Sequence, residues 1–308
     1  MGSSLFLSSL ANATLEGLVD EAVITRSARR ALIPLFRAGL FDDVKGIEWS
    51  SLDAGDIGSA EHRRVRDEAA LQSFVLLKNN AKAALPLAAG KHIAVLGPQS
   101  SGTGLFSDYF GDDVCWSPHP HYQSDTGCAT TIATAIAHAN AGGTTTNATG
   151  VSISGKNASG IPAALTLARA ADVVVLALGI DKTIEHEGAD RGNISLPGLQ
   201  EAFALQVIAI GKPVVLVLTN GGPLAIDNLV DKADAIVEAF NPAFGAPMLA
   251  EALFGANRWG KLPYVYLNPQ QRCPPPPALI VVAGAGYTVC SLSALCRACI
   301  IGSLRLVL

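Results

Sequence analysis

The chain has 308 residues, about two domains by the usual length prior, and 49% of them are hydrophobic, which is enough to fill a core. This composition excludes intrinsic disorder for most of the chain. The 26 acidic residues outnumber the 22 basic ones, for a formal net charge of −4, so DNA and RNA are excluded as default partners.

The N-terminal 60 residues show helical patterning. Residues 15–40 place apolar side chains near helical spacing, and Gly39 is a stop signal. A polar, glycine-bearing connection follows, and residues 61–78 then predict a second amphipathic helix. The first ten residues lack a positively charged segment and their apolar part is brief, so no signal peptide is expected in this chain.

Short β-branched runs alternate with helical patterns from residue 92 onward. They predict strands at 92–97, 151–154, 173–179, 213–220 and 235–240, and helices at 131–141, 161–171, 198–210 and 248–254. Continuous apolar strands suit a sheet that is covered on both faces, and the alternation predicts a doubly wound, mostly parallel α/β sandwich. Ligands bind such sheets beyond the carboxyl ends of the strands, which here means the loops that start at Gly97, Gly179 and Thr219.

The first of these loops, GPQSSGTG, is a weak phosphate-binding signal. It lacks the Lys-Ser/Thr pair of a P-loop, and Pro98 removes one backbone amide, so a plain turn is favoured. Downstream, Cys115 and Cys128 are expected to form either a disulfide or a reduced pair. Metal binding by these cysteines with His119 and His121 is the least favoured alternative, and no metal site is predicted.

The second loop concentrates charge in a charge-poor chain. Its charged side chains are Asp181, Glu185, Glu187, Asp190 and Arg191. Several carboxylates at a ligand-facing strand end are what general acid/base catalysis needs, because like-charge neighbours and partial burial keep one of them protonated. The alternative is a solvated loop in which Arg191 pairs with Asp190 or Glu187. His186 is expected to be exposed rather than a metal ligand, because no second His or Cys lies nearby at metal-ligand spacing.

Residues 278–296 form an uncharged run after four consecutive prolines, Pro274–Pro277. The run just reaches the minimum length of a membrane-spanning helix. Its Gly, Ser, Thr and Cys content is poor for a lipid-facing surface, so a tail foreign to the fold is favoured over a membrane anchor.

Five blocks between about Glu61 and Tyr266 resemble the second domain of glycoside hydrolase family 3. They are EHRRVRDEAALQSFVLLKNN with LPL at 85–87, HIAVLGP, VVVLALGIDKTIEHEGADRGNISLPGLQ, KPVVLVLTNGGPLAI and ALFGANRWGKLPYVY. The β-xylosidase branch looks most similar, followed by the β-glucosidases. Residues 15–42 are similar to the last helix of the (β/α)8 barrel that precedes this domain in the family.

The resemblance implies a division into a barrel remnant and linker at 1–60, the α/β sandwich at 61–268, and a tail at 269–308 that is not family-like. It also implies a secreted, retaining exo-glycosidase of the β-xylosidase type, acting on oligosaccharide or glycoside substrates without a cofactor. In that scheme Glu185 is the preferred acid/base, Glu187 is the alternative, and Asp190 and Arg191 shape the loop. The nucleophile is an Asp of the barrel.

The barrel segment that holds the nucleophile has no counterpart in this chain. Retaining hydrolysis needs two carboxyl groups roughly 5 Å apart, so the chain alone is predicted to be inactive. An incomplete gene model or a truncated product would explain this departure. The alternatives are a non-catalytic sandwich that binds carbohydrate or protein, and a version tethered to a membrane by residues 278–296.

Overall fold

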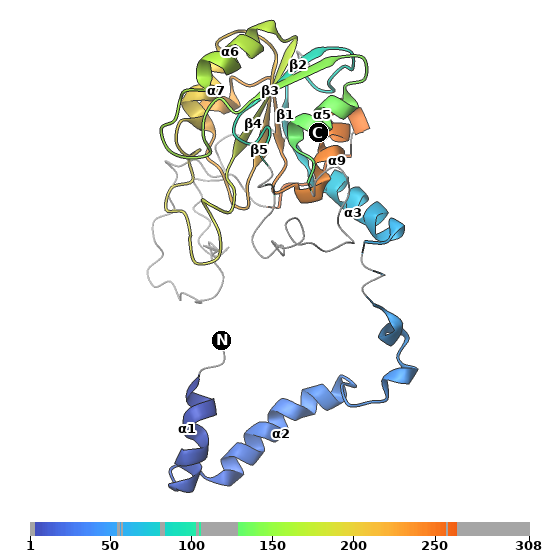
Figure 1. Cartoon of the computed structure of the whole chain (residues 1–308), viewed down its shortest axis with the longest axis vertical. Coiled ribbons are helices and arrows are strands. Elements are labelled where there is room, and N and C mark those ends of the chain that lie inside the picture. The colour runs from blue at the N-terminus through green and yellow to red at the C-terminus, as the bar shows by residue number, and fades with distance from the viewer. Residues whose placement is uncertain are drawn as a thin grey trace, which may run out of the picture. The chain divides into compact units, whose positions relative to one another are not determined.

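The structure is a computed structural model that describes residues 4–53, 56, 58–80, 84–102, 105, 129–256 and 258–263 (Figure 1). The chain divides into two compact units, Met1–His62 and Arg63–Leu308. The segment with Cys115 and Cys128 and the tail at 269–308 lie outside the described residues. Among the residues that are described, no helix is both long and apolar enough to cross a membrane.

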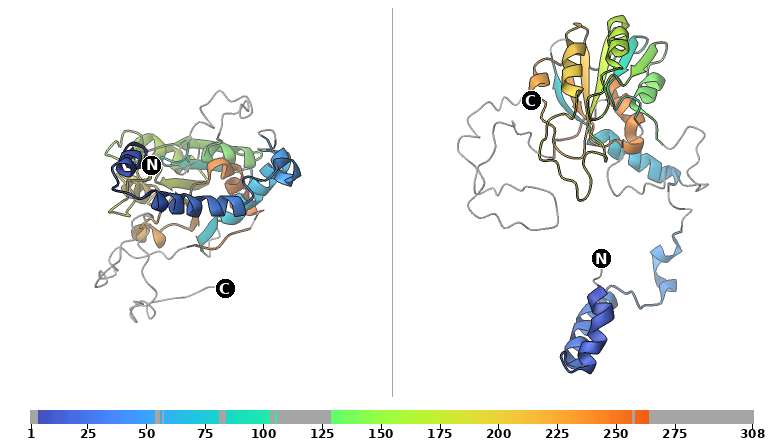
Figure 2. Two further views of the ribbon diagram at one scale, coloured as in Figure 1. Left: turned by 90° about the horizontal axis from the view of Figure 1, so that it is seen from below. Right: turned by 60° about the vertical axis from the view of Figure 1, so that its left-hand side comes forward.

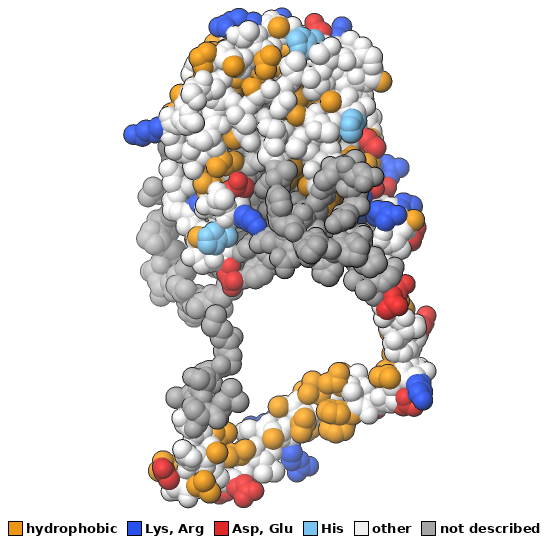
Figure 3. All heavy atoms as spheres, viewed as in Figure 1, with side chains coloured by type: hydrophobic (Ala, Val, Ile, Leu, Met, Phe, Trp, Pro, Cys, Tyr) orange, Lys and Arg blue, Asp and Glu red, His pale blue; other side chains and the backbone are white. Residues whose placement is uncertain are grey.

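The first unit contains helices α1 (Ser4–Leu15) and α2 (Glu21–Arg37), then the 3-10 turns η1 (Val44–Gly46) and η2 (Glu48–Ser51). The helix predicted at 15–40 starts later, because Asp20 caps α2: its Oδ1 accepts a hydrogen bond of 2.8 Å from the Ala22 amide. None of the residues of α2 is buried. Apolar side chains along this helix are therefore visible at the surface (Figure 3).

The second unit is built on a six-stranded sheet of order β1-β6-β5-β4-β2-β3. The strands are β1 (Val75–Asn79), β2 (His92–Leu96), β3 (Thr144–Ala148), β4 (Val173–Gly179), β5 (Val214–Thr219) and β6 (Ala235–Glu238). All neighbours pair in parallel except β1, which is antiparallel to β6. The predicted doubly wound, mostly parallel architecture is confirmed.

Helices cover both faces of this sheet (Figures 1 and 2). One face packs against α3 (Ala60–Ser73), α5 (Ile132–Ala139) and α9 (Ala246–Glu251), the last flanked by the turns η3 (Ala243–Gly245) and η4 (Ala252–Ala256). The other packs against α6 (Ile161–Ala170), α7 (Gln200–Ile208) and α8 (Asp227–Val230). Side chains of β4 and β5 alternate between the two cores, so both strands are fully buried, as their continuous apolar sequences predicted.

One predicted helix was too long, and one predicted strand was wrong. The helix predicted at 61–78 ends at Ser73, and the next residues form β1, which pairs with the outer edge of β6. The strand predicted at 151–154 is absent, because Gly150, at φ 67°, turns the chain and the Val151 amide bonds back to the Thr149 carbonyl. The third strand is instead β3, an edge strand of polar residues that pairs only with β2.

Candidate active site

The charged loop begins where β4 ends, at Gly179. This residue has a φ of 143°, and a Cβ atom there would lie 1.9 Å from the Thr219 carbonyl oxygen of β5. Only glycine allows the two strand ends to come this close. The Ile180 amide then bonds to the same Thr219 oxygen at 2.8 Å, which directs the loop across the carboxyl end of β5.

A tight turn then presents Glu185. The Asp181 carboxylate accepts a hydrogen bond of 2.9 Å from the Thr183 amide, and the Asp181 carbonyl accepts bonds from the Ile184 and Glu185 amides at 2.9 and 3.2 Å. Such Asx-type bonding fixes short loops without regular secondary structure. The backbone of Glu185 is therefore held by its own loop.

The Glu185 side chain is held by Arg191. Arg191 Nε donates to Glu185 Oε2 at 2.6 Å, and Arg191 Nη2 donates to the Pro223 carbonyl at 2.9 Å. The Arg191 side chain is only 8% exposed, whereas that of Glu185 is 27% exposed. The arginine is thus a buried support, and the carboxylate it holds is accessible to water.

The glycines after β5 make room for this carboxylate. A Cβ atom at Gly222 would lie 2.8 Å from Glu185 Oε1, closer than real side-chain contacts. Asn220 orders the same turn, since its Nδ2 donates to the Gly222 carbonyl at 2.8 Å. The turn after Thr219, one of the three strand-end loops singled out from the sequence, therefore packs directly against Glu185.

Of the four predicted site residues, the structure brings Glu185 and Arg191 together. Glu187 and Asp190 have exposed side chains, and His186 is exposed as predicted, with Nδ1 lying 2.8 Å from the Glu187 carbonyl oxygen. The alternative in which Arg191 pairs with Asp190 or Glu187 was wrong about the partner, which is Glu185. The turn after β5 places Gly222 and Pro223 next to the Glu185–Arg191 pair. The sequence of the charged loop alone does not reveal this contact.

Sequence reasoning missed two buried polar residues behind the site, Gln200 and Glu238. Gln200 Oε1 accepts from the Gly179 amide at 2.8 Å, and Glu238 Oε1 accepts from the Phe240 amide at 3.1 Å. Both side chains are fully buried. A glutamate inside the otherwise apolar run 235–240 was the signal that could have identified the second of them, because buried carboxylates need specific partners.

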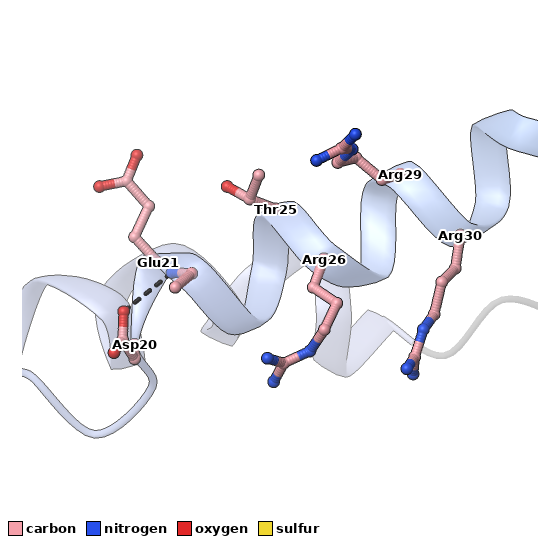
Figure 4. A pocket seen from close by; sticks show the side chains of 7 residues that line it. Asp20, Glu21, Thr25, Arg26, Arg29 and Arg30 are labelled. Carbon is pink, nitrogen blue, oxygen red and sulfur yellow. Dashed lines mark hydrogen bonds between the residues drawn. The ribbon is translucent and has the colours of Figure 1, made fainter.

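Two other regions do not form sites of comparable quality. In the loop after β2, the Gln99 and Ser100 amides are bonded to the Ala177 and Gly97 carbonyls, so they do not form the phosphate cradle weighed from the sequence. A hollow of about 730 Å³ along α2 is lined by Asp20, Glu21, Ala22, Thr25, Arg26, Arg29 and Arg30. Its arginines project to different sides of the helix and do not converge (Figure 4).

Comparison with known proteins identifies relatives over most of the chain. A sequence profile described as the glycosyl hydrolase family 3 C-terminal domain matches residues 74–279. Beta-D-xylosidase 1 of Arabidopsis thaliana is 34% identical over 260 residues, which are 82% of this chain and 31% of that protein. A probable exo-1,4-beta-xylosidase of Aspergillus fumigatus is 32% identical over 78% of this chain and 29% of its own length.

Solved structures show the same relationship. A GH3 exo-beta-xylosidase in complex with a xylobiose aziridine activity-based probe superposes with a TM-score of 0.70 at 29% identity, covering 82% of this chain and 31% of that one. The beta-glucosidase of Listeria innocua in complex with glucose has a TM-score of 0.67 at 26% identity, covering 83% and 33%. The chain spans about a third of the length of the relatives it matches.

Proposed function

Because the chain belongs to glycoside hydrolase family 3, we propose that it supplies the acid/base half of the active site of a retaining exo-glycosidase. The observation that carries this proposal is the Glu185–Arg191 pair, with its 2.6 Å contact, at the carboxyl end of β4. A carboxyl group that is fixed by a buried cation and still reached by water suits a residue that exchanges protons with substrate and solvent.

The proposed reaction has two steps. A barrel aspartate attacks the anomeric carbon while protonated Glu185 gives its proton to the leaving glycosidic oxygen, which forms a glycosyl-enzyme. The Glu185 carboxylate then takes a proton from water, whose oxygen attacks the anomeric carbon and releases the aspartate. Arg191 bonds Oε2 in the structure, so Oε1, beside Gly222, is the oxygen we assign to proton transfer.

The proposed substrate is a terminal β-linked xylose on an oligosaccharide, by similarity to proteins named β-xylosidases. The proposed partner is a (β/α)8 barrel that carries the nucleophile, with residues 1–60 as its C-terminal remnant and linker. Residues 61–268 are the sandwich domain and 269–308 a separate tail. We propose secretion on the basis of the family resemblance. Glu187 remains the alternative acid/base, and Asp190 is proposed to shape the loop.

The test uses the full chain alone and a chimera in which residues 61–268 replace the matching domain of the solved exo-β-xylosidase. The chain alone is expected not to hydrolyse an aryl β-xyloside, and the chimera is expected to do so. Glu185→Gln in the chimera should lower kcat/KM by about 10²–10⁴-fold. Activity of the chain alone, or a folded chimera whose activity is insensitive to Glu185→Gln, would refute the proposal. Sugar binding without turnover in the folded chimera would favour the non-catalytic binding domain.

A further inference from the structure

The strand order reverses next to β4. Strand β2 lies between β3 and β4, so the chain passes outward from β2 to β3 and then returns past β2 to reach β4. Among the described residues, α5 is the first helix after β2 and α7 is the first after β4, and the two pack on opposite faces of the sheet. The loops after two adjacent strands therefore diverge, which creates a crevice at the carboxyl ends, the usual ligand position of doubly wound sheets.

A hollow of about 340 Å³ occupies this position. Its walls come from Pro98, Gln99 and Gly102 after β2, from residues 149–153 after β3, from Asn157, Ser159 and Gly160 at the start of α6, and from Asp181 after β4. We call it the strand-end crevice. Its volume lies at the lower end of the range of small-ligand sites.

Two buried amide side chains fix the walls of the strand-end crevice. Gln99, which is 2% exposed, donates from Nε2 to the Ile180 carbonyl at 3.0 Å, joining the loops after β2 and β4. Gln200 donates from Nε2 to the carbonyls of Ile153 and Gly179, both at 2.7 Å, joining the 149–153 segment to the end of β4. The three walls are thus connected by hydrogen bonds, two of them buried and the one to Ile153 partly buried, so the crevice is preformed.

Two glycines shape one side of the crevice. Gly150 has a φ of 67°, and a Cβ atom there would lie 2.4 Å from the Phe203 ring. A Cβ atom at Gly160 would lie 2.8 Å from the Gly150 carbonyl oxygen. The turn after β3 and the start of α6 therefore meet backbone to backbone, an approach that a side chain at either position would prevent.

The lining selects a neutral, hydroxyl-rich ligand. Among the described residues that line the crevice, Asp181 is the only charged one, and Pro98 lacks an N–H. An anion would meet this carboxylate without a compensating cation. The remaining polar groups are hydroxyls and amides, Thr149, Ser152, Asn157 and Ser159 among them, and Val151 and Ile153 add apolar surface. Asp181 Oδ1 and Asn157 Oδ1 already accept hydrogen bonds from Thr183 and Ser159. Asp181 Oδ2 and Asn157 Nδ2 are therefore the groups that paired sugar hydroxyls would meet, and the C–H groups of the sugar match the apolar side chains.

We propose that the strand-end crevice binds a single pyranose ring of pentose or hexose size, as a site separate from the Glu185–Arg191 pair. The crevice uses neither residue of that pair, although Asp181 lines the crevice and also holds the turn that carries Glu185. The proposal goes beyond the acid/base proposal, and Glu185→Gln distinguishes the two sites. The free sugar is expected to bind with a dissociation constant on the order of 1–10 mM, as befits so small a ligand.

The test is calorimetric or NMR titration of the full chain with D-xylose and D-glucose. Thr149→Trp fills the crevice from an exposed position at its rim, directly after β3. Thr144→Trp is the matched control, because Thr144 is also exposed and lies at the other end of β3. Thr149→Trp should weaken binding at least about tenfold, and Thr144→Trp and Glu185→Gln should leave it unchanged. Asp181→Asn removes the charge at constant shape and should weaken binding at least about threefold.

Three results would overturn the inference. The first is no binding of either sugar to the wild-type chain at about ten times the expected dissociation constant. The second is binding that survives both Thr149→Trp and Asp181→Asn, or survives Asp181→Asn when the tryptophan variant does not fold. The third is binding that is lost in Glu185→Gln alone, which would place the sugar at the acid/base pair and leave the acid/base proposal intact.

Discussion

Replacing Arg191 with methionine removes the guanidinium group that holds Glu185 and keeps an unbranched apolar side chain in place of the arginine's aliphatic part. The change breaks the 2.6 Å ion pair and the 2.9 Å hydrogen bond to the Pro223 carbonyl. Loss of one partner from a fully buried pair costs about 3–5 kcal/mol. Water reaches the 27% exposed Glu185 side chain, so the ion-pair contribution falls to about 1–2 kcal/mol. The lost carbonyl bond adds about 1 kcal/mol, and we expect the free energy of unfolding to drop by about 2–3 kcal/mol in total.

Urea unfolding of the full chain, followed by circular dichroism, measures this loss directly. Arg258→Met is the matched control: Arg258 pairs with Glu68 at 2.5 Å, but the two side chains are 56% and 39% exposed. Such a surface pair contributes less than about 1 kcal/mol. Arg191→Lys keeps the charge but loses the planar fork that bonds Glu185 and Pro223 together, so we expect a loss of about 1–2 kcal/mol.

Equal effects of Arg191→Met and Arg258→Met, both below about 1 kcal/mol, would refute this reasoning. They would mean that Arg191 does not hold Glu185 in solution. An Arg191→Lys variant as stable as the wild type would contradict a narrower point, namely that one guanidinium must bond both the loop after β4 and the loop after β5.

Three further predictions follow from the strand ends and the comparisons. Gly179→Ala should destabilise the chain by more than about 3 kcal/mol in the same urea assay, because its Cβ would lie 1.9 Å from the Thr219 oxygen. Gly192→Ala is the control: its Cβ would have nothing within 4 Å, so stability should change by less than about 0.5 kcal/mol. Gln200→Leu should cost about 2–4 kcal/mol because it leaves Gly179 and Ile153 groups unbonded in the core, whereas the exposed Gln206→Leu should be near neutral. In its source cells, a peptide from residues 61–78 should be detected by mass spectrometry in a species far larger than 31.8 kDa; a species of that mass would contradict the proposed barrel partner.

The central strands could be predicted because a strand that is buried on both faces has apolar residues along its whole length. β4, VVVLALG, lies between two strands and two helical layers, so every one of its residues is apolar or glycine. The edge strands lack this signature. β3 is TTTNA and only half buried, and β1 was assigned to the end of a helix because apolar residues at 74, 75 and 77 fit either periodicity. Whether such a segment forms a helix or a strand depends on its pairing with the edge of the sheet, which is a tertiary interaction.

The site was predictable in composition but not in arrangement. The charged loop after β4 and the loop that starts at Thr219 both stood out as strand-end features. That Arg191 selects Glu185 depends on where Pro223 and Gly222 lie relative to the loop, which is set by the parallel register of β4 and β5. Gln200 bonds to Ile153, 47 positions away in the chain, and to Gly179, 21 positions away. Local sequence patterns therefore do not reveal these bonds.

The most direct test of the account is azide rescue in the chimera that carries residues 61–268. Removing the acid/base of a retaining glycosidase leaves a glycosyl-enzyme that water attacks slowly, and a small anion that needs no general base restores turnover. The account predicts that Glu185→Ala loses about 10²–10⁴-fold in activity, that azide restores turnover, and that the product is β-xylosyl azide. Glu187→Ala should stay within a few-fold of the parent chimera. Azide rescue of Glu187→Ala instead, or full activity of Glu185→Ala, would contradict the assignment.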